Sequence, residues 1–171
     1  APTSSMGRLF DTVSSLLGIR HTVDFEAQAA IELESRARGV DPGPEYAFAI
    51  VEGTPLLIDP APVLRALVAD LRVEVPVDVA AARFHAAVVA LVVELARRVR
   101  AERELSTVAL SGGVFCNALL LARAAEPLRA DGFTVLRHRR VPPNDGGLAL
   151  GQLVVSAALT DAPAATTPGE D

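Results

Sequence analysis

Apolar residues recur at helical spacing through the first hundred residues, with helix-starting and helix-ending residues at the boundaries of these stretches. Ser5, Asp24 and Asp59 stand where such stretches begin, and Gly18 and Gly39 stand where two of them end. Serine and aspartate are favoured N-caps, whereas glycine commonly follows the last helical residue. The pattern predicts helices over residues 6–17, 24–38, 59–71 and 79–100.

Short apolar runs of strand type interrupt this pattern. Residues 46–51 and 56–58, divided by Glu52-Gly53-Thr54-Pro55, predict a β-hairpin. Two strand–helix units follow, with strands at 108–110 and 133–136 and helices at 114–130 and 147–159. This order predicts an α/β fold class in one folded unit over residues 1–160. The Ala-, Thr- and Pro-rich residues 161–171 predict a disordered tail.

Composition narrows the class of protein. Half of the 171 residues are hydrophobic but only 4% are aromatic, so the core of the single domain is built mainly from Ala, Val and Leu. A net charge of −5 without a long basic stripe argues against nucleic-acid binding. Residues 84–99 are apolar but short for a membrane span, and they predict a buried helix and no membrane contact. No secretory signal opens the chain, which predicts a cytoplasmic location.

The cysteine and histidine content offers little chemistry. Cys116 is the single cysteine, which excludes an internal disulfide and a cysteine-rich zinc cluster. We interpret it as a packed small residue after a glycine turn. His85 lies in an apolar helix and is interpreted as a packed, hydrogen-bonded histidine, while His21 and His138 have no motif around them.

The most informative segment is Ser111-Gly112-Gly113, which joins a strand to a helix. Both glycines can adopt positive φ, and without Cβ atoms they let a ligand approach the backbone. Strand, glycine turn and helix is an arrangement that binds anions, most often phosphate. The alternative is a strand-to-helix turn that happens to use glycine.

A second loop of this kind spans residues 141–147, Val-Pro-Pro-Asn-Asp-Gly-Gly. Its prolines stiffen the backbone and hold Asn144 and Asp145 at another strand-to-helix junction. Such junctions gather at the carboxyl ends of strands, so we expect the two loops to form one site. Asp145 then either binds a metal or a water, or serves as an N-cap.

Taken together, these motifs resemble the HypF-type carbamoyltransferases. The resemblance extends over almost the whole chain except the hairpin region and the tail. The matching segments are residues 4–11, 25–34, 83–85, 110–117 and 139–151. It implies the C-terminal lobe of an actin/Hsp70-like nucleotide-binding domain, with a mixed sheet flanked by helices. The related tRNA-modifying branch has glycines where this chain has Ala27 and Gln28.

The resemblance also implies a reaction. HypF-type enzymes make carbamoyl-adenylate from carbamoyl phosphate and ATP. They transfer the carbamoyl group to the C-terminal cysteine of HypE, where it becomes the cyanide ligand of NiFe-hydrogenase. The expected ligands are therefore ATP or carbamoyl-adenylate, with ADP or AMP as simpler forms, and a divalent metal, Fe or Zn.

Site residues follow from the same resemblance, position by position. Asp11 and Glu32 match the positions that hold the ribose hydroxyls, and Asp145 matches a metal ligand. The glycine turn and the residue one helical turn later are expected to face the nucleotide; these are Ser111, Gly112, Gly113 and Asn117. No catalytic residue is assigned.

The expected partners are HypE, a preceding lobe and a YrdC-like domain of the same polypeptide. A single carboxylate is too few for a catalytic metal, so the metal is expected to be shared with the preceding lobe. We expect the chain alone to be inactive. Two alternatives stay open, an antibiotic O-carbamoyltransferase and a non-catalytic nucleotide-binding lobe. A tRNA-modifying enzyme is disfavoured by the acidic surface and by the sequence of the second loop.

Overall fold

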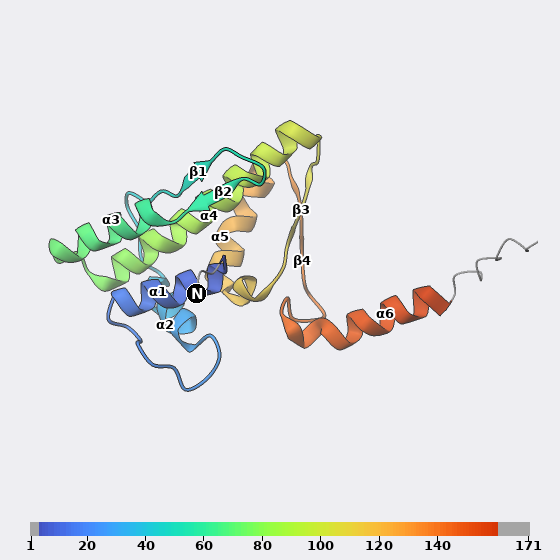
Figure 1. The fold of residues 1–171 in the computed structure, drawn as a ribbon, viewed down its shortest axis with the longest axis horizontal. Helices are drawn as coiled ribbons and strands as arrows, with labels where there is room; N and C mark the ends of the chain where they lie inside the picture. Colours follow the sequence, from blue (N-terminus) through green and yellow to red (C-terminus); the bar gives the residue numbers. More distant parts are fainter. Residues whose placement is uncertain (1–3, 161–171) are drawn as a thin grey trace, which may run out of the picture.

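The computed structural model describes residues 4–160, which form a helical body, a parallel strand pair and a projecting C-terminal helix (Figure 1). The helices are α1 (Met6–Leu16), α2 (Gln28–Ala37), α3 (Ala61–Arg72), α4 (Val77–Arg103), α5 (Ala118–Ala130) and α6 (Leu148–Thr160). The strands are β1 (Ala49–Val51), β2 (Leu57–Asp59), β3 (Thr107–Leu110) and β4 (Thr134–Arg137). Two short 3-10 turns, η1 (Gly113–Cys116) and η2 (Asp145–Gly147), follow β3 and β4.

The long helix α4 organises the body, because α2, α3 and α5 all pack against it. Three consecutive alanines, Ala80, Ala81 and Ala82, are fully buried and let neighbouring helices approach closely. By length and apolar composition alone α4 would suffice to cross a membrane, but half of its most apolar stretch is buried inside the structure. The predicted buried helix is therefore confirmed as the core helix of the fold.

The core has two parts along α4. The larger cluster joins α1, α2, α3 and α4 around Phe10, Leu33 and Phe84, with the two phenyl rings edge to face at 4.9 Å. The smaller cluster joins α4, α5 and the parallel strands around Leu110 and Leu128. The parallel strands are thus held to the body through α5 and the second half of α4.

A polar network ties the loop before β1 to this body. The Tyr46 hydroxyl donates to Asp70 Oδ2, and the Arg83 guanidinium donates to the same oxygen, both at 2.6 Å. Arg83 Nε also donates to the carbonyl of Pro42. Burial, followed by the hydrogen bond to Asp70, raises the pKa of the Tyr46 phenol. The network shows that Arg83 serves the packing of the loop against α3 and α4.

The sheets differ from the single mixed sheet that the resemblance implied. β1 and β2 form the predicted antiparallel hairpin, with Ile50 opposite Ile58. β3 and β4 form a separate parallel pair, with Val108 opposite Val135. Among residues 4–160 the strands therefore form two separate two-stranded sheets and not the one mixed sheet that was expected. The α/β class is confirmed, in a helix-rich form.

Most predicted helix boundaries are confirmed, but α2 starts after residue 24, and the helix predicted from residue 114 starts at Ala118, after the turn η1. Ser5 caps α1 by accepting the Arg8 N–H, and Gly18 and Gly39 have φ of +68° and +75° just after α1 and α2. Asp24 is not a cap, because its own N–H is bound by the Gln28 side chain at 2.8 Å and the chain stays in a loop. α2 begins four residues later, at Gln28.

The last helix is present as predicted but contacts little of the body. α6 extends away from the helical body and every one of its residues is exposed (Figure 1). Its apolar side chains include Leu153 and Leu159, which are 69% and 72% exposed. An apolar helix of this kind normally buries one face. The predicted tail at residues 161–171 lies outside the described residues.

The residue before α2 offers a test of backbone strain. Ala27 has φ +61°, a left-handed conformation that glycine adopts without a Cβ penalty. We expect Ala27→Gly to raise the free energy of unfolding by roughly 0.5–1 kcal/mol. Ala29→Gly, inside α2 and buried, should lower it by about 1 kcal/mol. Urea unfolding of both variants checks the opposite signs; equal destabilisation would contradict the strain at Ala27.

Candidate functional site

The two glycine-rich loops meet at one end of the parallel strand pair. β3 and β4 run in the same direction and end together, with Leu110 opposite Arg137. Beyond that point the Gly112 N–H donates to the Pro143 carbonyl at 2.9 Å, and Ser111 Oγ lies 2.8 Å from His138 Nε2. The prediction that the loops lie together at the carboxyl ends of the strands is therefore confirmed.

In the first loop only one glycine has the unusual backbone conformation. Gly112 has φ +92° and ψ +164°, a region that essentially only glycine occupies. Gly113 has no positive φ, which corrects the expectation for that residue; it begins η1 instead. One glycine is enough to turn the chain out of β3. No atom outside the turn lies within 4 Å of where a Cβ would stand on either residue, so the turn is open to an approaching ligand.

The second loop is closed by its own prolines. A Cβ on Gly146 would stand 2.8 Å from Pro142 Cγ, and one on Gly147 would stand 3.1 Å from the Pro142 carbonyl oxygen. Asn144 Oδ1 accepts the Gly146 N–H at 3.2 Å. The cap of η2 is thus Asn144, and the alternative that Asp145 is an N-cap is wrong. Asp145 is exposed at the rim of the loop.

Asp145 does not assemble a metal site within this chain. Across residues 4–160, no group of three or more His, Cys, Asp or Glu side chains is placed to hold a metal ion. Catalytic metals in proteins normally have three protein ligands. The described residues therefore do not by themselves fit a catalytic metal, and the ligand role of Asp145 stays a prediction.

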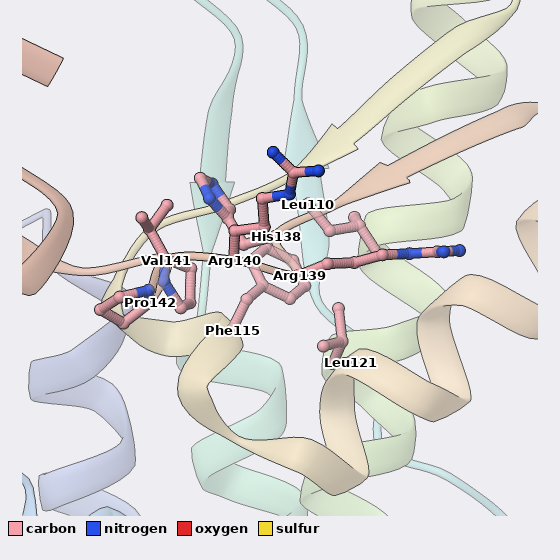
Figure 2. A pocket seen from close by; sticks show the side chains of 9 residues that line it. Leu110, Phe115, Leu121, His138, Arg139, Arg140, Val141 and Pro142 are labelled. Carbon is pink, nitrogen blue, oxygen red and sulfur yellow. The ribbon is translucent and has the colours of Figure 1, made fainter. Parts of the chain in front are cut away.

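Two hollows flank the joined loops. A groove of about 820 Å³ lies between the loops and α6, with Ser111 and Asn144 at one end and Val155 and Leu159 among its apolar wall. A smaller cavity of about 330 Å³ lies on the other side. Figure 2 shows its apolar floor of Phe115 and Leu121, with the guanidinium groups of Arg139 and Arg140 pointing away from it; His138 and residues 141–143 complete the lining.

Asn117 lies behind the first loop rather than in the groove. Its Oδ1 accepts the Leu120 N–H at 2.8 Å and so caps α5. Its Nδ2 lies 3.0 Å from Nε2 of His85, whose Nδ1 lies 2.8 Å from the Ala81 carbonyl. Burial lowers the pKa of the fully buried His85 imidazole. His85 is confirmed as a packed, hydrogen-bonded histidine, while nucleotide contact by Asn117 stays a prediction.

Comparison with known proteins agrees with this geometry. Residues 1–152 match the family model described as carbamoyltransferase, Kae1-like domain, second subdomain. The chain belongs to this family. It is 40% identical over 157 residues to the carbamoyltransferase HypF of Rhodobacter capsulatus and 37% identical over 153 residues to that of Synechocystis. These alignments cover 91% and 89% of the chain but only 20% and 19% of the relatives.

A solved structure with a similar sequence identity has the same fold. The crystal structure of full-length HypF in the phosphate- and nucleotide-bound form superposes with a TM-score of 0.86 and 40% identity, over 94% of this chain and 21% of that one. The resemblance to HypF-type carbamoyltransferases is thus confirmed. The chain spans about a fifth of the length of these relatives.

The two carboxylates expected at the ribose are engaged with arginines in this structure. Asp11 on α1 lies 3.0 Å from Arg8. Glu32 on α2 accepts from Arg20 Nη2 at 2.6 Å, from Arg20 Nε and from the Gln28 amide. The hydrogen bond from Arg20 lowers the pKa of the Glu32 carboxyl, although burial partly opposes it. Their contact with a ribose stays a prediction, with Arg20 as the residue that orients Glu32.

Two side chains near the turn differ from the sequence interpretation. Cys116 is exposed rather than packed, because it closes the short turn η1 and Phe115 provides the packing there. His138 lacks a motif, yet it reaches Ser111 across the strand pair. His138 is the first residue after β4, and Ser111 is the first residue after β3. The pairing of Leu110 with Arg137 places these two residues side by side, and that pairing is seen only in the structure.

The backbone of the first loop can be tested with a matched pair of variants. Gly112→Ala places a Cβ in a glycine-only conformation, and we expect it to lower the free energy of unfolding by roughly 1–3 kcal/mol. Gly113→Ala meets no atom and needs no positive φ, so its effect should stay within about 0.5 kcal/mol. Thermal and urea unfolding decide; equal effects would contradict the conformation assigned to Gly112.

Proposed function

We propose that this chain is the part of a HypF-type carbamoyltransferase that holds the nucleotide end of carbamoyl-adenylate during transfer of the carbamoyl group. The observation that carries the proposal is the joining of the Ser111–Gly113 turn to the 141–147 loop beside an open groove. A relative of known structure and 40% identity binds phosphate and a nucleotide. A glycine turn at the end of a strand is suited to the phosphate of such a ligand.

The chemistry proposed for the transfer is a substitution at the carbamoyl carbon. A thiolate sulfur of the acceptor attacks the carbonyl carbon, a C–S bond forms, and the bond from that carbon to the phosphate oxygen breaks. The products are a thiocarbamate and AMP, and the thiol proton passes to solvent. The exposed turn at Ser111, Gly112 and Gly113 would hold the phosphate that becomes the leaving group, with Asp11 and Glu32 toward the ribose.

The acceptor we propose is the C-terminal cysteine of HypE, in a reaction of the cytoplasm that supplies the cyanide ligand of NiFe-hydrogenase. The names of the relatives, carbamoyltransferases, support the proposal that the transferred group is a carbamoyl group. No residue of this chain is proposed as an acid or base. We assign this chain to holding and orienting the adenylate.

Other parts of the same polypeptide are proposed to complete the site. The groove has the loops and α6 on its sides and is otherwise open, whereas tight small-molecule sites enclose most of the ligand surface. The exposed apolar face of α6, with Leu153 and Leu159, is suited to packing against such a part. We propose the preceding lobe for this contact and a YrdC-like domain as the source of the adenylate.

The divalent metal, Fe or Zn, is proposed as shared between Asp145 and the preceding lobe. Asp145 supplies an exposed carboxylate in the second loop, and its neighbour Asn144 supplies the cap. When bound, such a metal would act as a Lewis acid at the phosphate or carbamoyl oxygen. Because the described residues hold no complete ligand set, we derive no step through the metal.

The transfer itself can be tested with the longer carbamoyltransferase that carries this chain. With ATP, carbamoyl phosphate and HypE, we expect the acceptor to gain the mass of one carbamoyl group. An acceptor whose C-terminal Cys is replaced by Ala should gain nothing, and the 171-residue chain alone should be inactive. Mass spectrometry decides among the alternatives. Transfer to a sugar hydroxyl instead would favour an O-carbamoyltransferase, and ADP binding without transfer a non-catalytic lobe.

The role of Asp145 has its own test. In the longer protein, Asp145→Asn should lower the bound metal while the free energy of unfolding changes by less than about 0.5 kcal/mol, since the carboxylate is exposed. Asn144→Ala should retain the metal but lose about 1 kcal/mol with the cap. Metal analysis beside thermal unfolding checks both variants. Full metal content in Asp145→Asn would exclude it as a ligand.

A further inference from the structure

We propose that His85 is a positioning residue that acts through Asn117 to hold the Ser111–Gly113 turn in its ligand-binding form. The inference rests on the proposed function, because it takes that turn as the part that holds the nucleotide. His85 itself lies inside the protein, on α4, and is fully buried.

The hydrogen bonds around His85 determine the state of its ring. The Ala81 carbonyl can only accept, so Nδ1 of His85 carries the proton and donates to it at 2.8 Å. Nε2 of the neutral ring is then an acceptor, and Asn117 Nδ2 donates to it at 3.0 Å. The opposite end of the Asn117 amide, Oδ1, accepts the Leu120 N–H. In these three hydrogen bonds each donor therefore faces an acceptor, and together they connect α4 to α5 through the Asn117 side chain.

Two phenyl rings and two charged groups surround the imidazole. The Phe10 ring stands edge to face with the imidazole at 5.4 Å, and the Phe84 ring does so at 6.0 Å. The charged groups facing His85 are Glu34 on α2, which favours the protonated ring, and Arg123 on α5, which disfavours it. A protonated ring would direct a second N–H at the Asn117 amide hydrogens. Burial among apolar rings favours the neutral ring that accepts from Asn117.

Asn117 occupies the junction at which this network controls the turn. Asn117 is both the C-cap of η1 and the N-cap of α5, and its own N–H donates to the Val114 carbonyl. Glu34 Oε1 accepts the next free N–H of α5, that of Leu119, at 3.2 Å. The far end of the turn is held separately, by the Gly112 N–H on Pro143. The turn is thus held by hydrogen bonds at two residues, Gly112 and Asn117, and the position of Asn117 depends on His85.

This arrangement accounts for a polar residue in the middle of an apolar helix. A phenylalanine at position 85 would fill the space and keep the ring contacts with Phe10 and Phe84. It would leave the half-buried Asn117 amide nitrogen without its acceptor, and the side chain would be held by its Oδ1 alone. A turn that is no longer held in one conformation must be ordered by the ligand, which weakens binding.

The first experiment reads the ring state directly in the 171-residue chain. At neutral pH, the ¹⁵N shifts of His85 should show a protonated Nδ1 and an unprotonated Nε2, and Asn117→Ser should change the Nε2 shift. Amide hydrogen exchange should be faster at residues 113–117 in His85→Phe, with the rest of the helical body unchanged. A proton on Nε2, or exchange that accelerates evenly through α1 and α4, would overturn the inference.

The second experiment asks whether His85 serves the ligand as well as the fold. In the longer carbamoyltransferase, His85→Phe should weaken ADP binding by about 10-fold, because a turn that is not held in one conformation must be ordered by the ligand. His21→Phe is the matched control, because His21 is exposed and its hydrogen bond joins the nearby Ser15; this variant should bind ADP as the wild type does.

A double variant separates positioning from stability. Asn117→Ser keeps a cap oxygen and removes the amide donor, so His85→Phe with Asn117→Ser should regain stability without regaining ADP affinity. If affinity returns together with stability, His85 is only structural and the inference is wrong. If the wild-type enzyme fails to bind ADP, the proposed function fails, while the ring state and the local exchange still decide whether His85 holds the turn.

Discussion

The parallel pairing of β3 with β4 is the constraint on which the candidate site depends. Parallel neighbours end on the same side, so pairing Leu110 with Arg137 brings both following loops to one place although residues 114–140 separate them. The crossover through α5 is what makes the strands parallel. The bond from Gly112 to Pro143 and the contact of Ser111 with His138 then fasten the loops to each other. A slip in register would separate these partners.

α4 supplies the rigid support beneath this pair. Its first half is packed among α1, α2 and α3, and its second half contributes Val93 to the cluster that holds the strands. The segment Arg83-Phe84-His85 on this helix performs three tasks. Arg83 ties down the loop before β1, Phe84 packs in the core, and His85 reaches the start of α5. All three residues of this segment, which matches the HypF-type enzymes, therefore make contacts with other parts of the chain.

Three features of this chain leave the candidate site open to solvent. The first loop has free space above its glycines, and the groove is lined on one side by a helix whose apolar residues are exposed. Asp145 is exposed and has no set of co-ligands among residues 4–160. These features agree with the coverage of about a fifth of the relatives.

Local signals in the sequence determined the elements. Ser5, Gly18 and Gly39 act within one helical turn of their own positions, so the boundaries they indicate are found in the structure. The predicted start of α2 was wrong because the Gln28 side chain accepts the Asp24 N–H and residue 24 stays in the loop; the N-cap is Ala27, without a side-chain cap. The strand, turn and helix order around Ser111 likewise follows from glycine and apolar spacing alone.

Tertiary structure alone decided how those elements meet. The pairing of Ser111 with His138 and the hydrogen bond of Asn117 to a histidine 32 residues earlier both depend on distances between segments. Separation of the hairpin from the parallel pair and exposure of α6 were also invisible in the pattern, since both depend on which surfaces are available for burial. Hydrophobic spacing determines which face of an element is buried, but the partner of that face is a property of the folded chain.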